Sequence, residues 1–139
     1  MTKTRAAVLV NTNEPLKIEG LTIPKLSHGQ VLVKMAFSGI CHSQLLEIRG
    51  RRGVDPYLPH TLGHEGAGTV VEIGPGVTRV APGNKVILSW IKGRGINASA
   101  PTYSQGNKKI NGGVKQTYEK IAKKLGNKNW HWDAPVRTP

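Results

Sequence analysis

The chain has 139 residues and a formal net charge of +12, with 17 glycines, 9 prolines and one cysteine. A single cysteine excludes an internal disulfide framework, and no apolar run approaches the length of about 18 residues that a membrane-spanning helix needs. The apolar run that follows the basic N-terminal residues is too short for a secretory signal, so the sequence predicts a cytoplasmic protein of one-domain size.

Short strands separated by Gly and Pro turns are predicted along the first 90 residues. The clearest is residues 30–38, where apolar and polar side chains alternate as they do in a half-buried strand. A short helix is expected at residues 43–49. The other strands are expected at residues 6–10, 16–19, 68–73 and 85–90. This spacing of strands and turns favours a mainly β barrel or sandwich.

After Trp90 the composition changes. Residues 92–113 are rich in Gly, Asn and Ser, which predicts a long loop. Apolar residues in 114–125 then follow at spacings of four, three and four, which predicts a helix with lysines on its other faces. Residues 127–139 show no period and are expected to form a loose tail.

The positive charge is concentrated in this last part of the chain. Residues 1–83 carry nine Lys and Arg against six Asp and Glu, a net of +3, whereas residues 84–139 carry eleven against two, a net of +9. Strong basicity is one mark of proteins that bind nucleic acids or anionic surfaces. Because the excess lies in one part, the two parts need separate interpretations.

Three side chains suggest a metal site. Cys41 follows the clearest strand, and His64 and Glu65 precede the next one. A thiolate, an imidazole and a carboxylate, with a fourth position open, are what a catalytic zinc needs. The spacing alone is weak evidence, because the residues form neither a C-x-x-C nor an H-E-x-x-H motif. A lone cysteine is also more often a small core hydrophobe.

Four segments together resemble the zinc-containing medium-chain alcohol dehydrogenases, and specifically their N-terminal GroES-like catalytic domain. The segments are GICHS at 39–43, PHTLGHEGAG at 59–68, VEIGPGVT at 71–78 and PGNKV at 82–86. The resemblance covers about residues 4–113, and its most specific block is 59–68. It implies a GroES-like, partly open β-barrel with short helices for residues 1–113. Residues 114–139 would then be an appended basic helical segment and loose tail.

The same resemblance assigns roles to individual residues. Cys41 and His64 would be catalytic zinc ligands, and Glu65 would lie at the metal as a fourth or alternating ligand. Ser43 would hydrogen-bond the alcohol and begin a proton relay, and His42 would face the phosphates of the cofactor. Two simpler interpretations stay open: Ser43 as a helix cap and His42 as a surface residue.

The sequence departs from the family at several points. Gln44 stands where many members place an aspartate that orients the metal-binding histidine. The loop at 93–113 contains no cysteine, so the resemblance implies no structural zinc there. The family's nucleotide-binding Rossmann domain, which normally supplies a further cysteine ligand, lies beyond the match. Residues 93–98 read G-x-G-x-x-A, but no helical pattern follows, so a dinucleotide fingerprint is not expected there.

The sequence therefore predicts the catalytic domain of a zinc-dependent, NAD(P)-linked alcohol dehydrogenase, an oxidoreductase that interconverts alcohols and aldehydes. Its substrate would be a small alcohol or aldehyde. As a truncated chain it is expected to bind zinc incompletely, to hold no nicotinamide by itself and to turn over negligibly. Neither the choice between NAD and NADP nor the oligomeric state follows from these residues.

Two other functions stay open. One is a GroES-like module that keeps its barrel without metal and serves a partner protein. The other is a nucleic-acid-binding protein that acts through the basic residues of 114–139, with Trp130 and Trp132 available for stacking on bases. Little in residues 1–83 supports nucleic-acid binding, which is the less favoured of the two.

Overall fold

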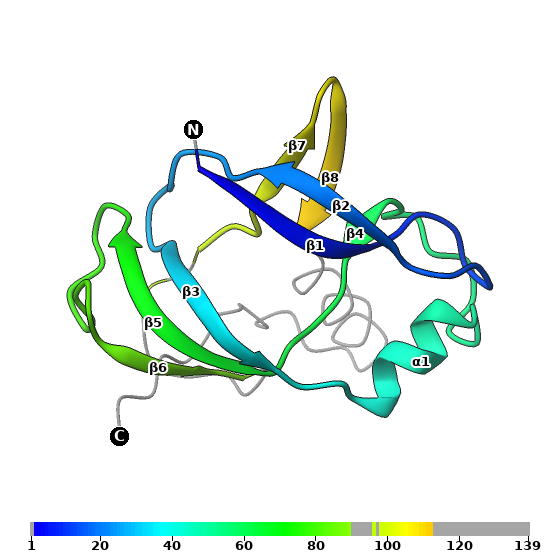
Figure 1. Ribbon diagram of the computed structural model, residues 1–139, viewed down its shortest axis with the longest axis horizontal. Helices are drawn as coiled ribbons and strands as arrows, with labels where there is room; N and C mark the ends of the chain where they lie inside the picture. Colours follow the sequence, from blue (N-terminus) through cyan, green and yellow to red (C-terminus); the bar gives the residue numbers. More distant parts are fainter. Residues whose placement is uncertain (1, 90–95, 97, 113–139) are drawn as a thin grey trace. The chain divides into compact units, whose positions relative to one another are not determined.

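A computed structural model describes residues 2–89, 96 and 98–112. The chain divides into two units, and each has its own β-sheet (Figure 1). Within the described residues, the first unit comprises 2–25, 40–63 and 100–112, and the second lies within 26–39 and 64–99. The predicted mainly β fold is confirmed, while the helix and tail predicted at 114–139 lie outside the described residues.

The first unit is a closed barrel of five strands in the order β1-β2-β7-β8-β4. The bounds of these strands are β1 Lys3–Leu9, β2 Lys17–Thr22, β4 His60–Thr61, β7 Thr102–Gln105 and β8 Lys108–Gly112. β1 pairs antiparallel with both β2 and β4, and β4 pairs parallel with β8, with His60 opposite Asn111. The short β4 therefore joins the first strand of the chain to the last described one.

The prediction of a loop at residues 92–113 is wrong for its second half. β7 and β8 form an antiparallel hairpin there, with Tyr103 opposite Ile110 (Figure 1). Gln105 pairs with Lys108, so the connection is the two-residue turn Gly106-Asn107, in which Gly106 has a φ of 57°. A left-handed glycine suits such a turn because its backbone twist matches that of the flanking strands.

The core of the barrel is small and comes from segments far apart in the sequence. Val8, Leu21 and Ile110 are buried together, and Tyr103 packs against them. β1, β2 and β8 thus each contribute one buried side chain to this core. Burial of a side chain of this size stabilises the fold by about 1.5–3 kcal/mol relative to its exposure.

The same unit holds the one helix of the described residues, α1, at His42–Ile48. It confirms the short helix predicted at 43–49, with its start one residue earlier. The backbone N–H of Asn13 donates to the carbonyl of Ile48 at 2.7 Å, which ties the end of α1 to the β1–β2 connection. The helix is too short to be stable in isolation, so its position depends on such contacts.

The second unit is a three-stranded antiparallel sheet in the order β3-β5-β6. These strands are β3 Val31–Ser38, β5 Gly66–Ile73 and β6 Lys85–Leu88, which confirms three of the predicted strands with small changes at their ends. Val70, Val80 and Val86 form its buried core. Two register shifts interrupt the pairing of β3 with β5.

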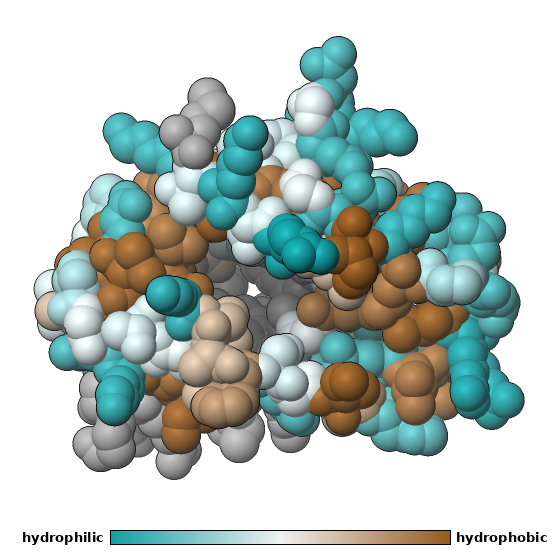
Figure 2. Space-filling view, in the orientation of Figure 1, coloured by the Kyte–Doolittle hydropathy of each residue, from teal (hydrophilic) through white to brown (hydrophobic). Residues whose placement is uncertain are grey.

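Several large apolar side chains of this second unit are exposed. Phe37 is 77% exposed, and Met35 and Ile87 are about half exposed. The hydropathy surface shows brown side chains in the region of β3 and β5 (Figure 2). The apolar residues of β3 are therefore packed against the core only at the end of the strand that holds Val31 and Val33. None of the helices among the described residues has the length and apolar character needed to cross a bilayer.

Candidate metal centre

All five predicted site residues lie next to points where the chain passes from one unit to the other. The chain leaves the second unit after Gly39, and Cys41, His42 and Ser43 follow after one intervening residue. The first unit is left after Gly63, and His64 and Glu65 follow directly. The two segments that carry the predicted ligands are thus both connections between β-units, at residues 40–43 and 63–65.

Cys41 begins α1. It is the N-cap residue, with extended backbone angles of φ −94° and ψ 147°. Its N–H donates to the side-chain Oε1 of Gln44 at 2.7 Å, and the N–H of Gln44 donates to the Cys41 carbonyl at 3.0 Å. Gln44 therefore holds the backbone of Cys41 through a capping-box contact, because a free N–H at a helix start needs an acceptor.

This geometry also decides one of the open interpretations for the residues beside Cys41. Ser43 is not the cap of α1, because it lies inside the helix, two residues after the N-cap. The helix-cap interpretation of Ser43 is therefore wrong. His42 is exposed at the first helical position. Its exposure fits both the surface interpretation and a role toward a bound phosphate.

His64 and Glu65 form a pair in the second unit. Nε2 of His64 lies 3.6 Å from Oε1 of Glu65, and the two side chains are 13% and 44% exposed. The backbone of Glu65 is held separately, because the N–H of Gly39 donates to its carbonyl oxygen at 3.1 Å. The carboxylate is thus left available to the imidazole and to solvent.

Gly39 makes room for Glu65. A Cβ on residue 39 would lie 2.5 Å from Oε2 of Glu65 and 3.0 Å from its Cβ, closer than side chains approach one another. The glycine of the Gly39-Ile40-Cys41 segment therefore leaves the space that the carboxylate of Glu65 occupies. The backbone of Glu65 is hydrogen-bonded to Gly39, and Gly39 is joined to Cys41 by two peptide bonds.

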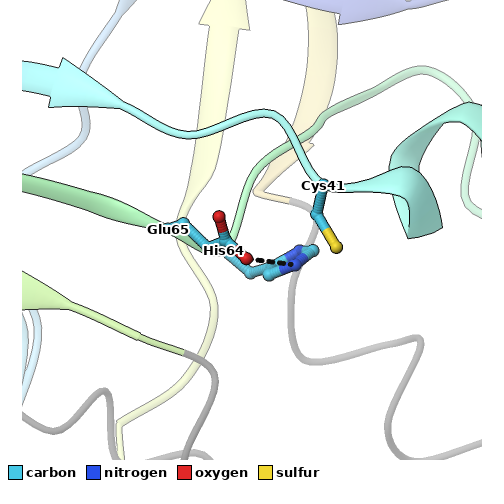
Figure 3. Close-up of side chains that lie close together, drawn as sticks. All are labelled: Cys41, His64 and Glu65. Atoms are coloured by element: carbon cyan, nitrogen blue, oxygen red, sulfur yellow. Dashed lines mark ion pairs between the residues drawn. The ribbon is translucent and has the colours of Figure 1, made fainter.

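The donor set has the chemistry of a zinc site. Figure 3 draws the three side chains with the elements that supply them: Cys41 begins α1, and His64 and Glu65 precede β5. Cys41 is a free cysteine. Sulfur, imidazole nitrogen and carboxylate oxygen are the three ligand types that zinc accepts in proteins. The residues present therefore fit a zinc ion.

Sequence reasoning missed two supporting residues of this segment. The resemblance includes Gly39 only as part of a motif, although its contact with Glu65 is structural. The resemblance places Gln44 at an aspartate position, although its side chain supports Cys41. The spacing of Cys41 and Gln44, three residues apart at a helix start, is a signal that could have predicted the capping contact.

Two other predicted features fall on residues that are not described. The basic residues of 114–139, with Trp130 and Trp132, lie outside the described part of the chain, as does most of the G-x-G-x-x-A segment at 93–98. Nucleic-acid binding therefore stays the less favoured alternative, and the absence of a dinucleotide fingerprint stays a prediction.

Solved structures with similar folds come from zinc-type alcohol dehydrogenases. A Burkholderia ambifaria structure described as an alcohol dehydrogenase zinc-binding domain protein has a TM-score of 0.60 and 35% identity, and the match covers 66% of this chain and 24% of that one. A thermostable alcohol dehydrogenase from Pyrobaculum aerophilum, solved with cobalt and zinc bound, has a TM-score of 0.56 and 33% identity, over 63% of this chain and 26% of that one.

Sequence comparison agrees with the structural likeness. The chain is 40% identical over 87 residues to an alcohol dehydrogenase of Geobacillus stearothermophilus, which is 63% of this chain and 26% of the relative. The chain thus spans about a quarter of the length of the curated relatives it matches. Residues 27–125 match the family described as the alcohol dehydrogenase GroES-like domain. With more than half of its residues in that match, the chain belongs to the alcohol dehydrogenase GroES-like domain family.

Proposed function

We propose that these 139 residues supply the zinc-binding part of an NAD(P)-linked alcohol dehydrogenase. The observation that carries the proposal is the arrangement around Glu65. His64 lies in ion-pair distance of its carboxylate, and Gly39, two residues before Cys41, binds its backbone. A histidine, a carboxylate and a thiol are therefore supplied by two short segments that one hydrogen bond joins.

Cys41 and His64 would hold the zinc ion, with Glu65 as a further or alternating ligand. Zinc in such a site polarises the oxygen of an alcohol or aldehyde and eases loss of the hydroxyl proton. Ser43, two residues after Cys41, would accept the substrate's hydrogen bond and pass the proton toward solvent. His42 would lie toward the phosphates of the nicotinamide cofactor, where its exposed ring is available.

The substrate would be a small alcohol or aldehyde, the class that the names of the relatives indicate. Residues 1–113 would form the GroES-like domain, and residues 114–139 a separate basic segment. Because the match spans about a quarter of the relatives' length, we infer that the 139 residues by themselves hold no nicotinamide and turn over negligibly. No zinc is proposed for residues 93–113, which contain no cysteine.

Metal binding by three variants tests this proposal. The wild-type chain is expected to bind Co²⁺ with a near-ultraviolet absorption band that arises from thiolate coordination, and Cys41→Ser is expected to lose that band. His64→Gln should weaken binding at this site at least tenfold. His42→Gln is the matched control, because it makes the same change at an exposed histidine beside Cys41, and it should leave the band unchanged.

Two results would contradict the assignment. Absence of the thiolate band in the wild-type chain would remove Cys41 as a ligand, and full retention of it in His64→Gln would remove His64. If in addition zinc were absent after purification and a chelator left the melting temperature unchanged, the chain would be better described as a metal-free GroES-like module.

A further inference from the structure

A second group of ligand-type side chains lies within the barrel unit, away from the residues discussed above. It consists of Glu47 in α1, Asp55 in the loop that follows, and His60 in β4. Nε2 of His60 lies 2.8 Å from Oδ2 of Asp55 and 3.9 Å from Oε1 of Glu47. His60 is almost completely buried, and the side chains of Asp55 and Glu47 are only 12% and 18% exposed.

The hydrogen bonds of His60 fix which ring nitrogen faces the carboxylates. Nδ1 lies 3.0 Å from the carbonyl oxygen of Thr61, and because a carbonyl only accepts, Nδ1 carries a hydrogen and donates it. Nε2 then points at two carboxylates, which are also acceptors. A bare lone pair at Nε2 would be repelled there, so a metal ion suits this point.

His60 and Asp55 are held as metal ligands usually are. A ligating histidine typically donates its other ring N–H to a backbone carbonyl, which is what His60 does with Thr61. The second carboxylate oxygen of Asp55, Oδ1, accepts the N–H of Tyr57 at 2.9 Å. The carbonyl of Tyr57 in turn accepts Nδ2 of Asn111 on β8 at 2.8 Å. The Asp55 carboxylate that faces Nε2 is thus positioned by backbone and by the barrel.

The spacing also suits a small divalent ion. Ligands at about 2.0–2.1 Å from a tetrahedral zinc lie about 3.3 Å from each other, and the two measured separations from Nε2 fall on either side of that value. One nitrogen and two carboxylate oxygens are ligands that zinc and cobalt accept, and water would complete the four. Movements of about half an ångström would bring both carboxylate oxygens to that separation from Nε2, and all three ligand atoms already lie within 4.8 Å of one another.

We propose that Glu47, Asp55 and His60 bind a divalent metal ion of the zinc and cobalt class, at a structural site distinct from Cys41. Such an ion would join three segments of one unit: α1, the loop after it and β4. Since Cys41 begins α1 and His60 lies in β4 beside β1, the ion would fix the helix that carries Cys41 to the barrel.

Cobalt binding to a chain without the cysteine tests this site alone. In a Cys41→Ser background, titration with CoCl2 is expected to show about one Co²⁺ per chain, with visible ligand-field absorption and no thiolate band. Adding His60→Gln or Asp55→Asn should weaken this binding at least tenfold. His42→Gln in the same background is the control for a histidine change and should leave it intact.

Glu47→Gln keeps the experiment decisive if the buried variants fail to fold. It leaves the hydrogen bond between His60 and Asp55 in place and removes only the charge of a partly exposed ligand. Weaker cobalt binding in this variant, with an unchanged circular dichroism spectrum, would support the site. No cobalt bound by the Cys41→Ser chain, or unchanged affinity in Glu47→Gln, would overturn the proposal and leave His60 hydrogen-bonded to Asp55 without a metal. The thiolate band of the wild-type chain reports on Cys41 separately.

Discussion

Gly39 and Gln44 each contact one of the predicted ligands. Gly39 leaves the space that the Glu65 carboxylate occupies, and Gln44 accepts the N–H of Cys41. Neither side chain is a ligand in our proposal. Both act on the backbone beside a ligand, and such supporting residues typically change metal affinity 10–100-fold when they are removed.

Replacing Gly39 tests whether Glu65 must lie where it does. In Gly39→Ala the new methyl group would collide with Glu65, so its carboxylate is expected to move away from His64. Because the nearest atom is the end of a flexible, half-exposed side chain, we expect a loss of about 1 kcal/mol or less in the free energy of unfolding. Zinc affinity should fall about tenfold. Isothermal titration with zinc and chemical denaturation measure the two effects.

The matched control is Gly20→Ala in β2, where a Cβ would meet nothing within 4 Å. It should change zinc affinity little. Equal zinc affinity in the Gly39→Ala and wild-type chains would mean that the position of Glu65 does not matter for the metal.

At the scale of elements, the β7–β8 hairpin completes the barrel. Tyr103 of β7 packs against Val8, Leu21 and Ile110, and Thr22 of β2 pairs with Ser104. The side chain of Gln105 also donates to the carboxylate of Glu19 on β2. The barrel can close only because this late segment reaches back to strands formed by the first 22 residues.

Because Tyr103 is buried, the stability of the barrel is expected to fall at high pH. Desolvation raises the pKa of its phenol above the ordinary value of 10.0, because burial disfavours the charged phenolate. The unfolded chain then loses this proton at a lower pH than the folded chain does. The stabilisation is complete below about pH 10, the unfolded pKa, and is lost as the pH rises through the folded pKa.

Tyr103→Phe is therefore expected to change stability by less than about 1 kcal/mol at neutral pH and to reduce the decline above about pH 10. Chemical denaturation at a series of pH values measures this. Tyr57→Phe, which leaves Tyr103 in place, should keep the decline. An identical decline in the wild-type and Tyr103→Phe chains would assign it to other groups.

At the scale of the whole molecule, two small cores carry the described fold. Each unit has three buried aliphatic side chains at its centre, Val8, Leu21 and Ile110 in one and Val70, Val80 and Val86 in the other. The chain spans about a quarter of the length of its relatives, so the activity of a whole alcohol dehydrogenase is a proposal for it. What these residues contain is two groups of side chains that could hold a metal ion.

Deleting residues 114–139 tests the proposed domain boundary. Both proposed metal groups and both cores lie within the described residues up to 112, so zinc content and melting temperature are expected to stay unchanged. A melting temperature lowered by several degrees would instead show that the last residues of the family match, which extends to 125, contribute to the fold. Differential scanning calorimetry and metal analysis of the two chains decide this.

Local patterns predicted the elements whose signal is local. The alternation in 30–38 and the β-rich runs before Gly74 and after Asn84 predicted β3, β5 and β6, because pleated strands repeat every two residues. β7 was missed because Thr102 to Gln105 contains one large apolar residue among polar ones. The Gly106-Asn107 turn signal was present, but it indicates a hairpin only when strands flank it. The two residues of β4 are too few to form a pattern.

By itself the sequence determined the mainly β fold and the residue types of the Cys41, His64 and Glu65 group. Strand periodicity, turn residues and donor chemistry are all properties of neighbouring residues. Only the tertiary structure decided which distant residues meet: Gly39 with Glu65, and His60 with Asp55 and Glu47. Such contacts depend on strand pairing and loop closure. In these cases they bring together residues up to 26 positions apart, the separation of Gly39 and Glu65. No local pattern encodes those distances, because they are properties of the folded chain.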